Sequence, residues 1–150
     1  MKTAEKVLLG LTILGGLLMM LRLPGAPVIM GVGCALLAGL YLFLNFPLLF
    51  DHPTKGLLKS PVYRQASANR KIGAAGFGYA LCMVVLCVLL AFQGQASRNQ
   101  LLMGVTFSAI AGAIAFTKRK SDSTDFYKRV LVRAAPAVAV GGLTLLLLSR

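Results

Sequence analysis

The sequence predicts an all-α membrane protein, a polytopic bundle of five transmembrane helices. Of its 150 residues, 57% are hydrophobic and only 13% are charged, with a mean hydropathy of +0.79, whereas soluble domains carry about 25% charged residues. Its five apolar runs are about 15 to 22 residues long, which suits helices that cross a bilayer better than the ~10-residue alternating strands of a membrane barrel. We therefore expect a single transmembrane domain over residues 1–150.

The first two spans are predicted at residues 7–21 and 28–49. Lys2 and Lys6 before a short apolar run resemble a secretory signal, but prolines flank the small residues of the only cleavage site, so we expect a retained span. In the connection between the spans, Gly25 provides a permissive backbone and Pro27 suits the start of a helix. This short connection predicts two antiparallel neighbours.

The other spans are predicted at residues 72–92, 101–117 and 130–148. The tight turn at residues 94–99 predicts that the first two of these are also antiparallel neighbours. The last one contains Arg133, expected to extend toward the interface, and Pro136, which is tolerated near a helix start. Asp122 or Thr124 is expected to cap this helix. The alternative is a four-span protein whose last segment lies along the interface.

The distribution of basic residues predicts the orientation. If all five segments cross, every Lys and Arg except Arg22, Arg98 and Arg150 falls on the side of the N-terminus. The positive-inside rule then places the N-terminus in the cytoplasm and the C-terminus outside a bacterial inner membrane. We attribute the net charge of +12 to contacts with anionic lipid headgroups rather than with nucleic acid, because the basic loops are short. The residues predicted to make these contacts are Lys55, Lys59, Lys118, Arg119, Lys120 and Arg133.

Small residues recur at every fourth position on several spans. This spacing allows helix backbones to approach closely in a membrane. Such sets either pack the helices of this chain against one another or build an oligomer. The two main sets are Gly31, Ala35 and Gly39, and Gly104, Ser108 and Gly112.

The sequence predicts no catalytic, cofactor-binding or metal site, and hence no enzyme. All four acidic residues are expected in a tail or in loops, which leaves Arg133 as the only charge within a span. Asp51 and His52 are adjacent but provide too few ligands for a metal. The polar groups Tyr41, Asn45 and Tyr79 either hydrogen-bond between helices or line a path through the bundle. The acidic residues are Glu5, Asp51, Asp122 and Asp125, and the cysteines, expected to be buried, are Cys34, Cys82 and Cys87.

Residues 15–46 carry a resemblance to a known family. The run Gly-Gly-Leu-Leu-Met-Met-Leu-Arg-Leu-Pro-Gly-Ala and the glycine-rich segment after it resemble the membrane hairpin of the stator subunit of gliding-motility and type 9 secretion motors. That resemblance implies an oligomeric inner-membrane hairpin. The family's lysine and glutamate are replaced here by Met19 and Leu37, and its long cytoplasmic region is absent, so proton-driven motor function does not carry over.

Together these features predict a structural or accessory subunit of an inner-membrane assembly. The alternative is a small channel or transporter whose pathway forms between protomers. A subunit should present a flat apolar face to another chain, whereas a channel should contain a continuous cavity lined by polar atoms.

Overall fold

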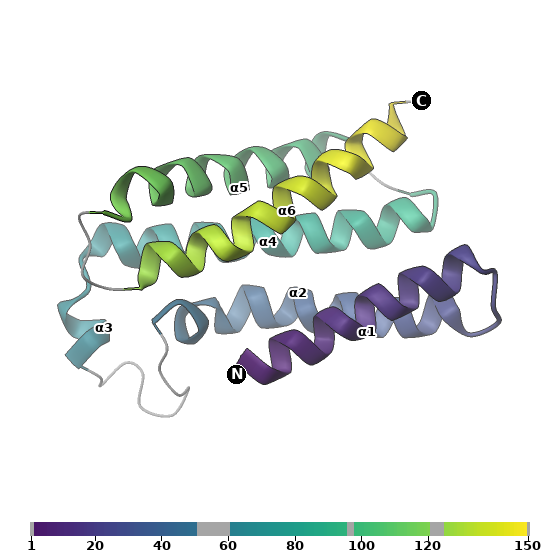
Figure 1. Ribbon diagram of the computed structural model, residues 1–150, viewed down its shortest axis with the longest axis horizontal. Helices are drawn as coiled ribbons and strands as arrows, with labels where there is room; N and C mark the ends of the chain where they lie inside the picture. Colours follow the sequence, from purple (N-terminus) through teal and green to yellow (C-terminus); the bar gives the residue numbers. More distant parts are fainter. Residues whose placement is uncertain (1, 51–60, 96–97, 121–124, 150) are drawn as a thin grey trace.

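The computed structural model describes residues 2–50, 61–95, 98–120 and 125–149, and every element in these ranges is a helix (Figure 1). Five of the helices are long and apolar enough to cross a membrane, which confirms the predicted all-α bundle. The helices are α1 (Lys2–Met20), α2 (Ala26–Phe50), α3 (Pro61–Gln65), α4 (Ala68–Phe92), α5 (Arg98–Lys118) and α6 (Phe126–Leu148).

Helices α2 and α4 pack against each other in the middle of the bundle. Helix α1 packs mainly on α2, while α5 packs on α4 and α6 packs on α5 (Figure 1). Leu37, Tyr41, Phe77, Leu81 and Ala134 are buried in the central cluster. Large apolar side chains are exposed along the outer sides of all five long helices, which is the pattern expected where the surrounding solvent is lipid.

Two tight turns make the hairpins. After α1, Arg22 has a φ of 55° and the Leu23 N–H donates to the Leu18 carbonyl at 3.1 Å. After α4, Gly94 has a φ of 71° and the Gln95 N–H donates to the Leu90 carbonyl at 2.8 Å. Both are left-handed helix endings that satisfy the last carbonyls. The chain therefore reverses directly, and α1–α2 and α4–α5 are antiparallel neighbours as the sequence predicts.

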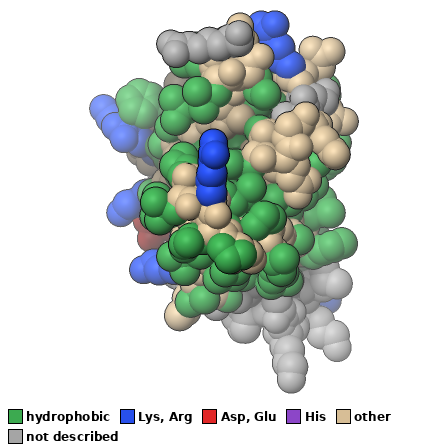
Figure 2. Space-filling view, turned by 90° about the vertical axis from the view of Figure 1, so that its right-hand side faces the viewer, with side chains coloured by type: hydrophobic (Ala, Val, Ile, Leu, Met, Phe, Trp, Pro, Cys, Tyr) green, Lys and Arg blue, Asp and Glu red, His purple; other side chains and the backbone are tan. Residues whose placement is uncertain are grey.

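The two ends of the bundle differ in charge. The hairpin turns and the C-terminus lie at one end, the turn end; Figure 2 shows that hydrophobic side chains cover most of it, with isolated Lys or Arg side chains. The start of α4, the end of α5 and the start of α6 lie at the opposite end (Figure 1). We call this the basic end, after Arg70, Lys71, Lys118, Arg119 and Lys128.

The helices are longer than predicted at their basic ends. Helix α1 begins at Lys2 and so includes Glu5, while α4 begins at Ala68 with Ser67 as its N-cap. Helix α6 continues through Arg133 and Pro136 without a break and packs along α5. Some predicted features lie outside the described residues; these are Asp51, His52, Lys55, Lys59, Asp122 and Thr124. The prediction that Asp122 or Thr124 caps α6 is wrong, because α6 begins at Phe126 and its N-cap residue is Asp125, whose side chain makes no capping hydrogen bond.

Candidate functional site

An ion pair joins α1 to α6. Arg133 donates from Nε to Glu5 Oε1 and from Nη2 to Glu5 Oε2, both at 2.6 Å. The side chain of Arg133 is 10% exposed and that of Glu5 is 14% exposed. Arg133 Nη1 also donates to the Arg129 carbonyl at 3.3 Å. Two parallel charge-assisted hydrogen bonds make this a strong and directional contact.

This pair corrects two predictions. Glu5 was expected in a tail, but α1 begins early enough to place it inside the helix, where it faces α6. Arg133 was expected to reach lipid headgroups, but its guanidinium binds Glu5 and is mostly buried. The sequence did contain a signal for this ion pair. Glu5 and Arg133 have opposite charges and lie near the same predicted membrane side of two apolar segments.

A groove of about 660 Å³ runs from this ion pair between α1, α2, α4 and α6. Its charged end also includes Lys6, Lys128 and Asp125, and the remainder is largely apolar. The side chains along its length include Leu9, Ile13, Leu37, Val132 and Val140. The charged pair is therefore held beside a hydrocarbon-lined space, where a single unpaired charge is costly.

The three polar residues predicted in the spans lie in different surroundings. Asn45 is buried and its Nδ2 donates to the Ala74 carbonyl of α4 at 2.5 Å, which is an interhelical hydrogen bond. Tyr41 is buried beside Glu5 and Arg133. Tyr79 is half exposed on the outside of α4. The structure thus brings only Tyr41 to the ion pair and does not place the three along one path.

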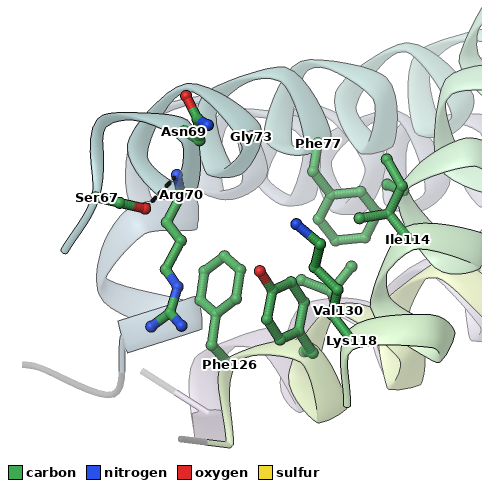
Figure 3. A pocket seen from close by; sticks show the side chains of 11 residues that line it. Ser67, Asn69, Arg70, Gly73, Phe77, Ile114, Lys118, Phe126 and Val130 are labelled. Atoms are coloured by element: carbon green, nitrogen blue, oxygen red, sulfur yellow. Dashed lines mark hydrogen bonds between the residues drawn. The ribbon is translucent and has the colours of Figure 1, made fainter. Parts of the chain in front are cut away.

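A second cavity, of about 580 Å³, opens at the basic end between α4, α5 and α6. Figure 3 shows Arg70 extending from the first turn of α4 beside Phe126, whereas Lys118 lies on the other side of Phe126 with its amino group toward Phe77. The guanidinium of Arg70 lies 5.7 Å from the centre of the Tyr127 ring. We call this space the basic cavity. Sequence analysis named Lys118 but missed the other residues, which meet only once the three helices are packed.

Three of the predicted headgroup residues lie at and just after the end of α5. Lys118, Arg119 and Lys120 are all exposed at the basic end. The Arg119 guanidinium lies 4.4 Å from the centre of the Phe116 ring. Aromatic rings continue along this end, with Phe50 and Phe126 at 5.2 Å between centroids and Phe46 and Tyr63 at 6.0 Å. Basic and aromatic side chains are therefore concentrated at the level expected for a membrane interface.

The two predicted sets of small residues have different environments. Ser108 is fully buried, and a Cβ at Gly104 or Gly112 would lie 3.0 Å from Val84 or 3.3 Å from Ala134. That set packs α5 against its neighbours. A Cβ at Gly31 or Gly39 would meet nothing within 4 Å, and Ala35 is exposed. The set on α2 therefore faces away from the other helices of this chain.

The cysteines behave as small core residues. Cys34, Cys82 and Cys87 are all free and buried within the apolar spans. Among the described residues, no three side chains of His, Cys, Asp or Glu come together as a metal site.

Comparison with other proteins gives no further assignment. No protein-family model matches the chain, and neither curated proteins nor solved structures give a match.

Proposed function

We propose that this protein is a small, non-catalytic subunit of a bacterial inner-membrane assembly that receives a partner helix on one face of α2. The observation that carries the proposal is the open α2 face, formed by Gly31, Ala35 and Gly39. A Cβ at either glycine would meet nothing within 4 Å, although α2 contacts α1 and α4 on its other sides. Small residues on an outward face lower the barrier to close backbone contact with another helix in lipid.

Gly33, on the side of α2 that packs inside the bundle, shows what such a contact requires. A Cβ on Gly33 would lie 3.0 Å from the Thr12 hydroxyl of α1, so close packing already depends on the missing side chain there. Gly31 and Gly39 provide the same kind of surface without a neighbour in this chain. A partner chain, either another subunit or a second copy, would complete the packing.

Filling the open α2 face should weaken assembly. We expect Gly31→Leu/Ala35→Leu/Gly39→Leu to weaken association by about tenfold or more, because the three bulky side chains keep the partner helix at a distance. A loss of only ~1.4 kcal/mol in the free energy of association is enough for a tenfold change. The measurement is capture of the tagged full-length chain from native membranes, together with disulfide crosslinking of Ala35→Cys to detect a second copy.

A matched control is available on α5. Thr106, Ala109 and Ala113 are exposed on one face of that helix, so their triple replacement by leucine adds apolar bulk to an exposed helix face elsewhere. This control should assemble as the parent does. Equal assembly of both triple variants and the parent protein would contradict the role proposed for α2.

We also propose that the basic end faces the cytoplasm and contacts anionic headgroups. Support comes from the concentration of bases at one end of the bundle and from the apolar character of the other end in Figure 2. The N-terminus is then cytoplasmic and the C-terminus lies outside.

Labelling from one side of a sealed vesicle tests this orientation. A membrane-impermeant maleimide added outside cells or right-side-out vesicles should label Arg98→Cys and leave Arg119→Cys unlabelled until the membrane is opened. The native cysteines are buried in the spans and should give little background. Labelling of both positions from the same side would overturn the topology.

A further inference from the structure

We propose that the groove between α1, α2, α4 and α6 holds one zwitterionic phospholipid with a primary amine in its headgroup, as in phosphatidylethanolamine. The phosphate lies between Lys6 and Lys128, the ammonium group lies at Asp125, and an acyl chain follows the groove. This site is separate from the open α2 face of the proposed assembly, because none of the residues of that face lines the groove.

Part of the charge at the end of the groove is already neutralised within the chain. The Glu5 carboxylate and the Arg133 guanidinium bind each other. The Arg129 guanidinium donates to the Leu49 carbonyl at 3.2 Å. These groups connect α1 and α2 to α6, and the recognition of a headgroup falls to other side chains.

Three other charged side chains lie at the same end. Lys6 comes from α1, Lys128 comes from the first turn of α6, and Asp125 is the N-cap residue of α6. All three line the groove and are exposed. Within the described part of the chain, no hydrogen bond or ion pair engages any of these three side chains. Two cations and one carboxylate complement one phosphate and one ammonium group, with charge-assisted hydrogen bonds to both.

The carboxylate distinguishes between headgroups. A primary ammonium group donates hydrogen bonds to a carboxylate, whereas the trimethylated amine of phosphatidylcholine has no N–H group. Phosphatidylglycerol has no cation at all, so it would leave Asp125 without a partner. The set of charges at the groove therefore favours phosphatidylethanolamine over both of these lipids.

Beyond the charged end, the groove is lined by hydrocarbon. Leu9 and Ile13 line it from α1, and Val132 and Val140 line it from α6. All four side chains are exposed, so the chain does not fill the groove with its own residues. The lining extends about 18 Å along α6 from Lys128 to Val140. An acyl chain that follows a headgroup at the charged end matches this order of polar and apolar walls.

The size of the groove argues for a lipid rather than a partner helix. A helix segment about 10 Å wide and 18 Å long occupies roughly 1,400 Å³, whereas the groove measures about 660 Å³. The Glu5–Arg133 pair also joins α1 to α6 at the charged end and keeps the two walls together. A hydrocarbon chain is narrower than a helix and enters without breaking this pair.

The test measures lipid binding to the purified full-length chain by native mass spectrometry. The probes are phosphatidylethanolamine, phosphatidylcholine and phosphatidylglycerol with identical acyl chains. We expect the parent protein to retain one phosphatidylethanolamine with a preference of about threefold over each of the others, the size expected for charge pairs at an exposed site. Equal retention of the three lipids, or a preference for either of the other two, would overturn the proposal.

Charge variants assign the headgroup contacts. Asp125 makes no capping hydrogen bond, so Asp125→Ala should leave α6 intact and remove the preference over phosphatidylcholine. Lys6→Gln/Lys128→Gln should lower the retention of all three lipids, because each carries a phosphate. Arg119→Gln/Lys120→Gln changes two bases outside the lining and should bind as the parent does. An undiminished preference in Asp125→Ala, or equal binding by the two double variants, would contradict the assigned contacts.

Bulky variants locate the acyl chain. Val132→Trp/Val140→Trp adds two large side chains to the lining and should lower the retention of all three lipids. Val28→Trp/Val32→Trp is the matched control, because these valines of α2 lie outside the lining. Their exposures of 68% and 48% match the 67% and 49% of Val132 and Val140. Equal retention by the two variants would show that the acyl chain does not occupy the groove.

Competition separates the lipid from its free headgroup. Phosphoethanolamine carries the same phosphate and amine without hydrocarbon, so it should compete far more weakly than the lipid. Equal competition by the two would overturn the assignment to a lipid. The measurement uses the isolated chain, so failure of the α2 partner proposal would not change it. Its result in the parent protein does not depend on whether any variant folds.

Discussion

Replacing Arg133 with leucine is expected to destabilise the bundle by about 3 kcal/mol and to release the start of α1 from α6. The substitution leaves Glu5 at the charged end of an apolar groove without the two 2.6 Å hydrogen bonds that now satisfy it. Removing one partner of a buried pair costs about 3–5 kcal/mol, and the open groove places this pair at the lower end of that range. The measurement is equilibrium unfolding of the purified protein in mixed detergent micelles.

Separation of the helices should accompany the loss of stability. Helix α1 packs mainly on α2, so the ion pair is its main attachment to α6. Spin labels at Leu9 and Val132, on opposite walls of the groove, should give a longer and broader distance distribution in Arg133→Leu than in the parent protein.

Two comparisons isolate the pair. Lys128→Leu removes an exposed cation from the same helix and should change stability by less than about 0.5 kcal/mol. Glu5→Leu/Arg133→Leu removes both charges and should recover most of the lost stability, because no unpaired charge remains. Equal effects of Arg133→Leu and Lys128→Leu, or simple additivity in the double variant, would show that the pair contributes little.

The number of helices and their turns follow from local features of the sequence. Apolar length identifies each span, and Gly25 and Gly94 each take up a positive φ in a predicted connection. These properties depend on a few neighbouring residues. They could therefore be predicted without knowledge of how the helices pack.

The rotation of each helix is not predictable in the same way. Gly31 and Gly33 lie two positions apart on α2, yet Gly33 packs on Thr12 and Gly31 is open. Apolar residues surround each span, so no polar stripe indicates which side faces the protein. The choice is made by the combined packing of α1, α2 and α4, and spacing alone does not distinguish the two glycines.

The lining of the basic cavity could be predicted from the sequence only in part. Arg70 and Lys118 are far apart in sequence but equally distant from Gly94, the turn between α4 and α5. In a tight antiparallel hairpin, such positions lie at the same depth, so their proximity could have been deduced from the turn. The contribution of Phe126 and Val130 could not, because it depends on where α6 packs.

Replacing Gly78 with leucine should destabilise the bundle by about as much as Arg133→Leu does. The substitution acts at the contact between α2 and α4. A Cβ at Gly78 would lie 2.6 Å from the Tyr41 carbonyl oxygen and 2.8 Å from Asn45 Cβ. The first neighbour is backbone, so α2 must move away from α4 to admit any side chain. Inserting groups into packed interfaces costs about 1–3 kcal/mol, and a leucine here is expected to reach or exceed the upper value.

The same change should break a specific contact. The Asn45 Nδ2 group would also lie 2.9 Å from the new Cβ, so its hydrogen bond to the Ala74 carbonyl is lost as the helices separate. A buried amide without its acceptor adds about 1–3 kcal/mol to the cost. Helices α2 and α4 connect the α1–α2 hairpin to the other three spans, so we expect the hairpin to become accessible to protease in micelles.

Gly76→Leu is the matched control for this substitution. It lies two residues away on α4, and a Cβ there meets nothing within 4 Å. Both variants replace one glycine with one leucine in the same helix, so intrinsic helix propensity and hydrophobicity change equally. A stability difference of about 3 kcal/mol between them would therefore measure the close approach of α2 to α4, and equal stability would show that these two helices do not pack through Gly78.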